Sequence, residues 1–167
     1  MFEHTKGVLR ALVIAIVAIF GLSLIIPQQI ALQHEIVINL SQDSVFKYLE
    51  NGDNIKSYFP NLKGLKIEDK GDGDFIFIGH DGELHRLELR AANKARGVEL
   101  TYYDDNDKKG VFLLTTKKYN EQTLLLQTQF WNLGYNPLAK LWGHQTKKES
   151  QEKLEDEMII LKSILEQ

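Results

Sequence analysis

The segment that decides the fold is Ile30–Asn51, IALQHEIVINLSQDSVFKYLEN. In its first part, up to Leu40, large apolar residues alternate with mostly polar ones, which is the period-two pattern of a strand with one buried face. Ser41 then offers an N-cap hydroxyl, and apolar residues recur at helical spacing as far as Leu49. Asn51-Gly52 ends the segment. We therefore expect a long first strand followed directly by a short helix.

The chain from residue 55 to residue 132 alternates short apolar segments with turn sequences. A second short helix is expected around Ile55–Phe59, before Pro60. Beyond it, turn residues cluster at 70–74, 80–82, 104–110 and 120–122. The six strands expected between these turns cover residues 65–68, 75–78, 83–90, 97–103, 111–118 and 123–132. The pattern predicts one antiparallel hairpin after another.

The C-terminal part has the opposite pattern. From Leu138 to Leu165 apolar residues recur at intervals of three and four, with Lys and Glu between them. We expect one amphipathic helix about 40 Å long, begun by Asn136-Pro137. Its polar middle section, 143–153, is expected to cross a cavity mouth or to face solvent.

An apolar run, Ala11–Ile26 (ALVIAIVAIFGLSLII), precedes the first strand. Together with the residues just before it, this run has about the 20 residues that a membrane-spanning helix needs. Lys6 and Arg10 lie on its N-terminal side, and the next basic residue is Lys47, so the positive-inside bias places the N-terminus in the cytoplasm. The sequence thus predicts a single-pass anchor in the cell (inner) membrane, with residues 8–26 in the lipid bilayer.

The predicted division of the chain is 1–27 for the cytoplasmic tip and anchor and 28–167 for one extracytoplasmic domain. A cleaved signal peptide is the alternative for the N-terminal run. Cleavage after Gly21-Leu22-Ser23 would, however, leave three large apolar residues at the new terminus.

Composition excludes several classes of site. The chain has no cysteine, so disulfides, thiolate metal sites and cysteine nucleophiles are excluded. Its net charge is −3, and it lacks the Lys/Arg cluster with interleaved aromatic residues that binds nucleic acid. The five histidines lack the helical pairing of a zinc protease, and the Asp cluster at 104–107 lacks the ligand spacing of a calcium loop. We therefore expect no metal, no cofactor and no nucleic-acid partner, and the sequence does not define an oligomeric state.

Four segments resemble the SRPBCC superfamily, in particular its polyketide cyclase/dehydrase and lipid transport branch, which is akin to START domains. Ile30–Asn51 is similar to the opening strand and helix of that family, and Tyr58-Phe59-Pro60 to the aromatic-x-Pro that ends its second helix. His85–Tyr103 resembles a family hairpin, and Asn120–Gly143 resembles the last strand and the proline-containing start of the last helix. The resemblance covers residues 30 to 167.

The resemblance implies an α+β helix-grip (START-like) fold, in which a curved antiparallel sheet of about seven strands wraps around a long C-terminal helix. It also implies a cavity between sheet and helix for a lipid or another apolar molecule. In the last strand, the row Leu124, Leu126, Thr128 and Phe130 is expected to be core, and the mixed row on the other face contains Gln129 and Trp131. The candidate cavity residues are His34, Tyr102, Gln129, Trp131, Tyr135, Trp142 and Met158.

Three functions follow as hypotheses. The first is a membrane-anchored, non-catalytic carrier or sensor of an apolar small molecule, with no catalytic residue assigned. The second is a cyclase- or hydratase-type enzyme, for which His34 and His85 are the best acid–base candidates. The third is a protein-interaction module that uses the polar stretch of the last helix. Ordinary core packing also accounts for the large aromatic residues and for His34.

Overall fold

The computed structural model describes residues 2–59, 62, 64–79, 82–92, 96–104 and 107–167. The helices are α1 (Phe2–Ile25), α2 (Gln42–Glu50), a 3-10 turn η1 (Gly52–Asn54), α3 (Ile55–Tyr58), α4 (Pro137–Gln145) and α5 (Lys147–Leu165). The strands are β1 (Gln29–Ile38), β2 (Ile67–Gly71), β3 (Asp74–Ile78), β4 (Leu84–Ala92), β5 (Gly97–Asp104), β6 (Asp107–Tyr119) and β7 (Gln122–Asn132).

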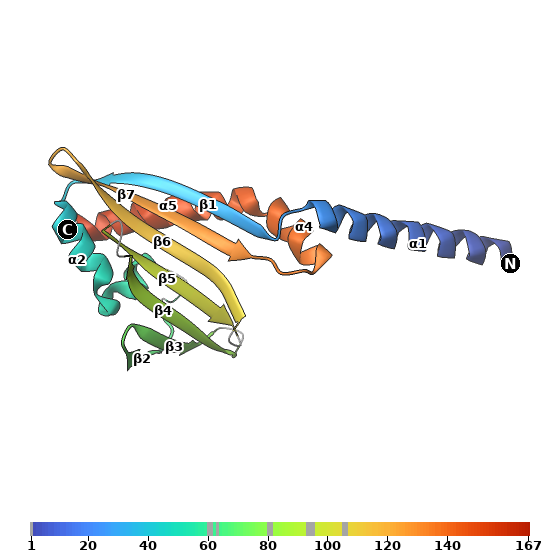
Figure 1. Ribbon diagram of the computed structural model, residues 1–167, viewed down its shortest axis with the longest axis horizontal. Helices are drawn as coiled ribbons and strands as arrows, with labels where there is room; N and C mark the ends of the chain where they lie inside the picture. Colours follow the sequence, from blue (N-terminus) through green and yellow to red (C-terminus); the bar gives the residue numbers. More distant parts are fainter. Residues whose placement is uncertain (1, 60–61, 63, 80–81, 93–95, 105–106) are drawn as a thin grey trace.

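In the described residues the strands form one seven-stranded antiparallel sheet with the order β1-β7-β6-β5-β4-β3-β2. The sheet is curved, and α5 runs along it beside β1, while α2 lies at the end where the C-terminus is (Figure 1). Side chains of α2, α3 and α5 form a single core with alternate residues of the strands. This arrangement confirms the predicted α+β helix-grip fold.

Local signals explain the first elements. The Ser41 hydroxyl accepts a hydrogen bond from the Ser44 N–H at 3.2 Å, so α2 is capped as predicted. Asn136 caps α4 by accepting from the Leu138 N–H at 2.9 Å, and Pro137 occupies the first turn. Asp72 at the tip of the β2–β3 hairpin has a φ of 53°, between Gly71 and Gly73, which also have positive φ.

The expectation for the two faces of β7 is wrong. Thr123, Leu125, Gln127 and Gln129 are buried, whereas Leu124, Leu126 and Thr128 are half-buried and Phe130 is exposed. The reason lies in the pairing with β1, because residues directly opposite each other point to the same face. The buried row of β1 lies opposite the mixed row of β7, as in the pairs Ile36–Leu125 and Leu32–Gln129. The helices cover that face, so the mixed row of β7, which contains Gln127 and Gln129, is the buried one.

The C-terminal helix differs from the prediction of one continuous helix. It is divided at Thr146, which separates α4 from α5. The Thr146 hydroxyl donates to the Trp142 carbonyl oxygen at 3.0 Å, and the Thr146 N–H donates to the same oxygen at 2.9 Å. Threonine side chains that bond the preceding turn compete with the regular helical pattern. The polar stretch 143–153 therefore contains the junction.

Helix α1 covers the apolar N-terminal run and projects away from the sheet (Figure 1). Most of its described large apolar side chains are exposed, as is Phe20 near its C-terminal end. The helix meets α4, and the His144 Nε2 lies 3.2 Å from the Pro27 carbonyl oxygen. Within the described part of the chain, no helix combines the length and the apolar character needed to cross a membrane. A helix in this run is thus confirmed, but the structure does not provide the predicted transmembrane span.

Candidate functional site

A cavity of about 500 Å³ lies between the sheet and the segment that follows α3. The described lining residues come from that segment and from β3 to β7, and they are Phe59, Leu62, Leu65, Phe77, Gly79, His85, Leu87, Tyr102, Phe112 and Trp131. The C-terminal helix contributes none of them. Its residues Leu154, Met158 and Leu161 are instead fully buried in the core. The cavity therefore lies beside the packed α5 helix, and not between that helix and the sheet as predicted.

Strand β4 places two cavity residues by simple alternation. His85 and Leu87 are 5% and 2% exposed and face the cavity. Arg86 and Glu88 lie on the opposite face, where Arg86 forms ion pairs with Asp74 and Glu88. Side chains of a strand alternate between its two faces, so the charged row lies on the face away from the cavity, and the row that faces the cavity is apolar apart from one imidazole.

Aromatic rings form a continuous wall of the cavity. Phe112 lies edge-on to Trp131 with ring centroids 5.0 Å apart, and Phe59 lies edge-on to Phe112 at 4.6 Å. Tyr102 continues the wall, with its ring centroid 6.3 Å from that of Trp131. The Trp131 ring lies over Gly110, where an added Cβ would come within 3.2 Å of the ring. Glycine at this position leaves room for the indole.

The polar groups of the lining gather at one end. The Tyr102 hydroxyl and the His85 Nδ1 are 2.8 Å apart, and the Asp104 Oδ1 lies 3.4 Å from the same nitrogen. His85 also stacks between Phe77 and Tyr102, with ring centroids 5.3 and 5.6 Å away. The Asp104 Oδ1 is buried and makes no hydrogen bond within the described residues. A phenol, an imidazole and a carboxylate therefore meet where the cavity is otherwise apolar.

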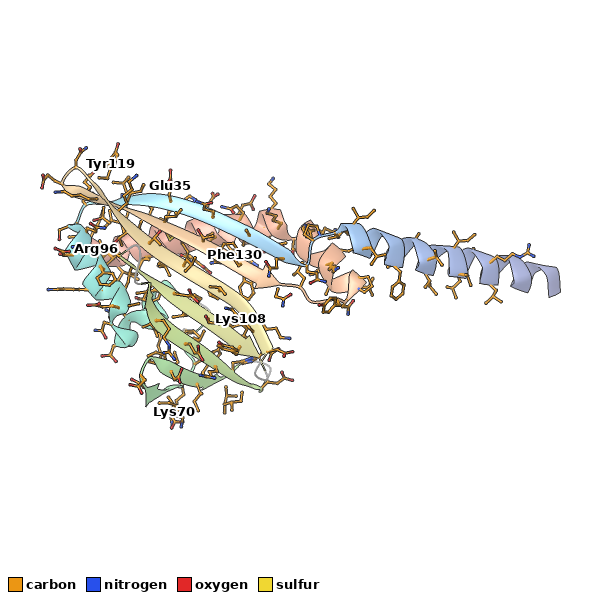
Figure 2. The ribbon with its side chains drawn as sticks, in the orientation of Figure 1. Glu35, Lys70, Arg96, Lys108, Tyr119 and Phe130 are labelled. Atoms are coloured by element: carbon orange, nitrogen blue, oxygen red, sulfur yellow. The ribbon has the colours of Figure 1, made fainter. Side chains whose placement is uncertain are left out.

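This polar end of the cavity lies near the strand ends that are on the same side of the sheet as α1. Ile30, next to the first residue of β1, is opposite Trp131, and Trp131 is opposite Gly110. Gly110 in turn is opposite Tyr102, so the row leads straight across the sheet to the cavity. In Figure 2, Lys108 marks this end of β6, whereas Tyr119 marks the end far from α1.

The structure brings some of the sequence-predicted site residues together. Tyr102 and Trp131 line the cavity. Gln129 is buried next to it, and its Oε1 accepts a hydrogen bond from the Trp131 Nε1 at 3.3 Å. Met158 is fully buried in α5 and belongs to the core.

The other predicted residues lie elsewhere. His34 is on β1, with its Nδ1 3.9 Å from the Glu155 Oε1, and does not line the cavity. Tyr135 and Trp142 are 84% and 68% exposed, next to or on α4. These two aromatic residues face away from the core, and α4 adjoins the α1 helix.

Most of the apolar lining, including Phe59, Phe77, Leu87 and Phe112, is not among the residues predicted from the sequence. His85 is likewise not among the predicted cavity residues. A signal was present, because His85, Leu87 and Leu89 alternate with Arg86, Glu88 and Arg90, and all three residues of the first row are buried. The aromatic residues of separate strands carry no such signal, since their convergence depends on the register of the pairing.

Glu157 on α5 is a titratable group beside the buried polar row of β7. Burial raises its pKa above the ordinary value, although a hydrogen bond with Gln129 and the charge of Lys153 act in the opposite direction. A raised pKa means that the folded state binds the proton more tightly than the unfolded state, so this group lowers stability once the pH exceeds the unfolded value of about 4.3.

Glu157→Gln is therefore expected to raise the free energy of unfolding at pH 7, with the gain shrinking as the pH falls through the raised pKa of the folded state and disappearing below about 4. Urea unfolding at several pH values measures this difference. Glu152→Gln, at an exposed position of the same helix, is the matched control. A gain that does not change with pH would contradict the assigned cause.

Among the described residues, no cluster of histidine and carboxylate side chains has the arrangement of a metal site. The chemistry that the geometry itself supports is the enclosure of an apolar molecule, with hydrogen bonding at one end.

Comparisons of sequence find no protein-family model and no curated protein that match the chain. Solved structures are similar in fold. The Bacillus halodurans protein BH1534 is 12% identical with a TM-score of 0.61, over 84% of this chain and 100% of that chain. A Thalictrum norcoclaurine synthase is 11% identical with a TM-score of 0.57, over 82% and 94%. The Colwellia psychrerythraea protein Aha1 is 16% identical with a TM-score of 0.56, over 82% and 96%.

Norcoclaurine synthase and Aha1 are SRPBCC, or Bet v1-like, proteins, and the resemblance noted in the sequence extends to the complete architecture. The likeness covers the sheet, the short helices and the C-terminal helix, and at these identities it concerns the fold. The chain therefore shares the helix-grip fold of these proteins.

Proposed function

We propose that this protein binds an apolar small molecule in the cavity beside α5, as a non-catalytic carrier or sensor held at a membrane by its N-terminal helix. The observation that carries the proposal is the cavity of about 500 Å³ with its wall of aliphatic and aromatic side chains. This volume is within the range of small-molecule sites, which are mostly apolar with a few polar groups. Removal of apolar ligand surface from water supplies about 25 cal/mol per Å².

One structural neighbour supports binding of a small molecule by this architecture, because the norcoclaurine synthase structure contains a transition-state analogue. A di-domain ARO/CYC protein of a biosynthetic pathway shares the fold over 45% of its own chain, with a TM-score of 0.57. These likenesses concern the fold, so the case for ligand binding here depends on the cavity itself.

A cyclase- or hydratase-type enzyme is the second candidate, and the contact between His85 and Tyr102 favours it. An imidazole beside a phenol and the Asp104 carboxylate is an arrangement that can move a proton. The two candidates differ in what happens to the bound molecule. An enzyme converts it, whereas a carrier releases it chemically unchanged.

The place of the protein at a membrane is part of the proposal. The described side chains of α1 include ten exposed large apolar residues, which water solvates poorly. They are Val8, Leu9, Leu12, Val13, Ile14, Ile16, Val17, Phe20, Leu24 and Ile25. We propose that α1 inserts into the cell (inner) membrane with the N-terminus in the cytoplasm, which holds the polar end of the cavity close to the bilayer on the outer side.

The fluorescence of Trp142 provides a test of the proposed insertion of α1 into the membrane. Tryptophan and tyrosine concentrate at the boundary between lipid and water, and Trp142 and Tyr135 are exposed near the C-terminal end of α1. In Trp131→Phe, Trp142 is the one remaining tryptophan. We expect its fluorescence to be quenched by phosphatidylcholine brominated near the headgroup, and much less by lipid brominated near the bilayer centre. Equal insensitivity to both lipids would contradict the placement of α4 at the membrane surface.

The fluorescence of Trp131 provides a test of ligand binding in the cavity. In Trp142→Phe, Trp131 is the one remaining tryptophan, and it lines the cavity wall. We expect bromodecane to quench its fluorescence in a saturable manner, because the bromine must enter the cavity to reach the ring. Trp131→Phe, which retains the exposed Trp142, is the control for quenching without specific binding. Absence of saturable quenching of Trp131 would contradict the proposal.

A further inference from the structure

Gln129 links the C-terminal helix to the wall of the cavity. It lies on the buried row of β7 and is 6% exposed. Its Oε1 accepts a hydrogen bond from the Trp131 Nε1 at 3.3 Å, and its side chain also forms a hydrogen bond with the Glu157 carboxyl group of α5. Trp131 lines the cavity. Two hydrogen bonds in series therefore connect a titratable group of α5 to one of the rings of the cavity wall.

The chemistry of these three groups allows one orientation of the Gln129 amide when Glu157 is ionised. An indole N–H only donates, and an ionised carboxylate only accepts. The amide must therefore turn its oxygen to Trp131 and its NH2 group to Glu157. A protonated Glu157 can instead donate to the amide oxygen, where it competes with the indole N–H. The ionisation of Glu157 thus decides how firmly the amide holds the indole.

The bond to Gln129 also selects the orientation of the Trp131 ring. The other neighbours of the ring are apolar, with Phe112 edge-on to it and Gly110 beneath it. Such contacts do not distinguish the two edges of an indole, whereas the N–H on one edge has to meet the Gln129 oxygen. A ring that turns over loses this bond and gives the wall a different shape. A ligand that must first order its site binds more weakly than one that finds the site formed.

The charge on Glu157 depends on its immediate surroundings. Burial raises its pKa, whereas the Gln129 bond and the charge of Lys153 act in the opposite direction. Among the described residues, Lys153 is the charged group that acts on Glu157. Titratable groups on other elements that pack against α5 have partners of their own. They are His34 on β1, which faces Glu155, Tyr58 on α3, which donates to the Leu49 carbonyl oxygen, and His144 on α4, which faces the Pro27 carbonyl oxygen.

We propose that Gln129 and Glu157 are positioning residues of the ligand site, which hold the Trp131 indole in the orientation that forms the cavity wall. The ionised Glu157 fixes the amide, and the amide fixes the ring. The proposal rests on the proposed binding function, because its consequence is a ligand affinity that falls when Glu157 is protonated.

Two measurements on the full chain with Trp142→Phe in lipid nanodiscs test the proposal. The first is the proton–nitrogen NMR signal of the one remaining indole, that of Trp131, followed from about pH 8 to about pH 4. We expect this signal to shift as Glu157 takes up its proton, above the ordinary glutamate value of about 4.3. The second is the dissociation constant of bromodecane from quenching of Trp131. Bromodecane does not titrate, so its affinity should fall about twofold to tenfold over the same pH range through the loss of one hydrogen bond in the protein.

Glu157→Gln should abolish both changes, because an amide does not titrate. Gln129→Met, which removes the amide and keeps a side chain of similar length, should also uncouple the indole signal from Glu157. Glu152→Gln, at an exposed position of α5, is the matched control and should retain both changes. A shift that persists in Glu157→Gln belongs to other groups, such as His85 at the polar end of the cavity.

The proposal is overturned if Glu157→Gln keeps the pH dependence of the indole signal or of the affinity. It is equally overturned if the indole signal follows Glu157 while the affinity for bromodecane stays constant. If bromodecane does not quench Trp131 in a saturable manner at any pH, the proposed binding function itself fails. The indole signal, which needs no ligand, separates that failure from a failure of the link through Gln129.

Discussion

Leu154→Ala is expected to lower the free energy of unfolding by about 2–5 kcal/mol, the usual cost of a large-to-small change at a fully buried site. Leu154 is 1% exposed and packs in the core between α5 and the sheet. The change removes apolar contacts and leaves a void, because a helix fixed against the sheet has little freedom to close it. Urea unfolding followed by circular dichroism measures the difference.

Ile159→Ala is the control on the same helix. Ile159 is 57% exposed, so its truncation should change the free energy of unfolding by less than about 0.5 kcal/mol. The pair tests which face of α5 is packed against the sheet. Equal losses for the two variants would show that α5 is not fixed in this orientation.

Filling the cavity is expected to remove ligand binding without unfolding the protein. Leu65 and Leu87 both line the cavity, and Leu65→Trp combined with Leu87→Trp places two indoles in space that is open in this structure. Added volume that enters open space avoids the strain of overpacking, so the unfolding midpoint should stay the same or rise. The protein should then carry no apolar molecule.

Leu126→Trp is the matched control for this variant. Leu126 is a half-buried residue of the outer row of β7 and does not line the cavity. The Leu126→Trp variant should bind the apolar molecule as the parent chain does. Full binding by the double variant would show that the ligand site lies elsewhere on the protein.

Elements that depend on local sequence could be predicted. The cap at Ser41, the alternation in β1, the start of α4 at Asn136-Pro137 and the succession of hairpins all agree with the structure. Each depends on neighbours within a few residues, so a pattern in the chain contains the information. The resemblance of these segments to the SRPBCC superfamily then indicated the architecture, a curved antiparallel sheet of about seven strands with a long C-terminal helix.

Features that depend on contacts between distant segments could not be predicted in the same way. Leu124 and Leu126 are more apolar than Gln127 and Gln129, yet the pairing with β1 buries the glutamines. The cavity likewise needs Phe77, Phe112 and Trp131 from three different strands. The break at Thr146 depends on side-chain bonds to the preceding turn, which the apolar spacing of the helix does not show.

The central claim, that the cavity holds an apolar molecule, is tested most directly by native mass spectrometry of the full chain purified under mild conditions, beside the Leu65→Trp, Leu87→Trp variant. We predict a stoichiometric extra mass on the parent protein that extraction identifies as an apolar, lipid-like molecule, and its absence from the filled variant. A parent protein that is empty and stays empty after incubation with lipids and alcohols, or an equal extra mass on both proteins, would contradict it.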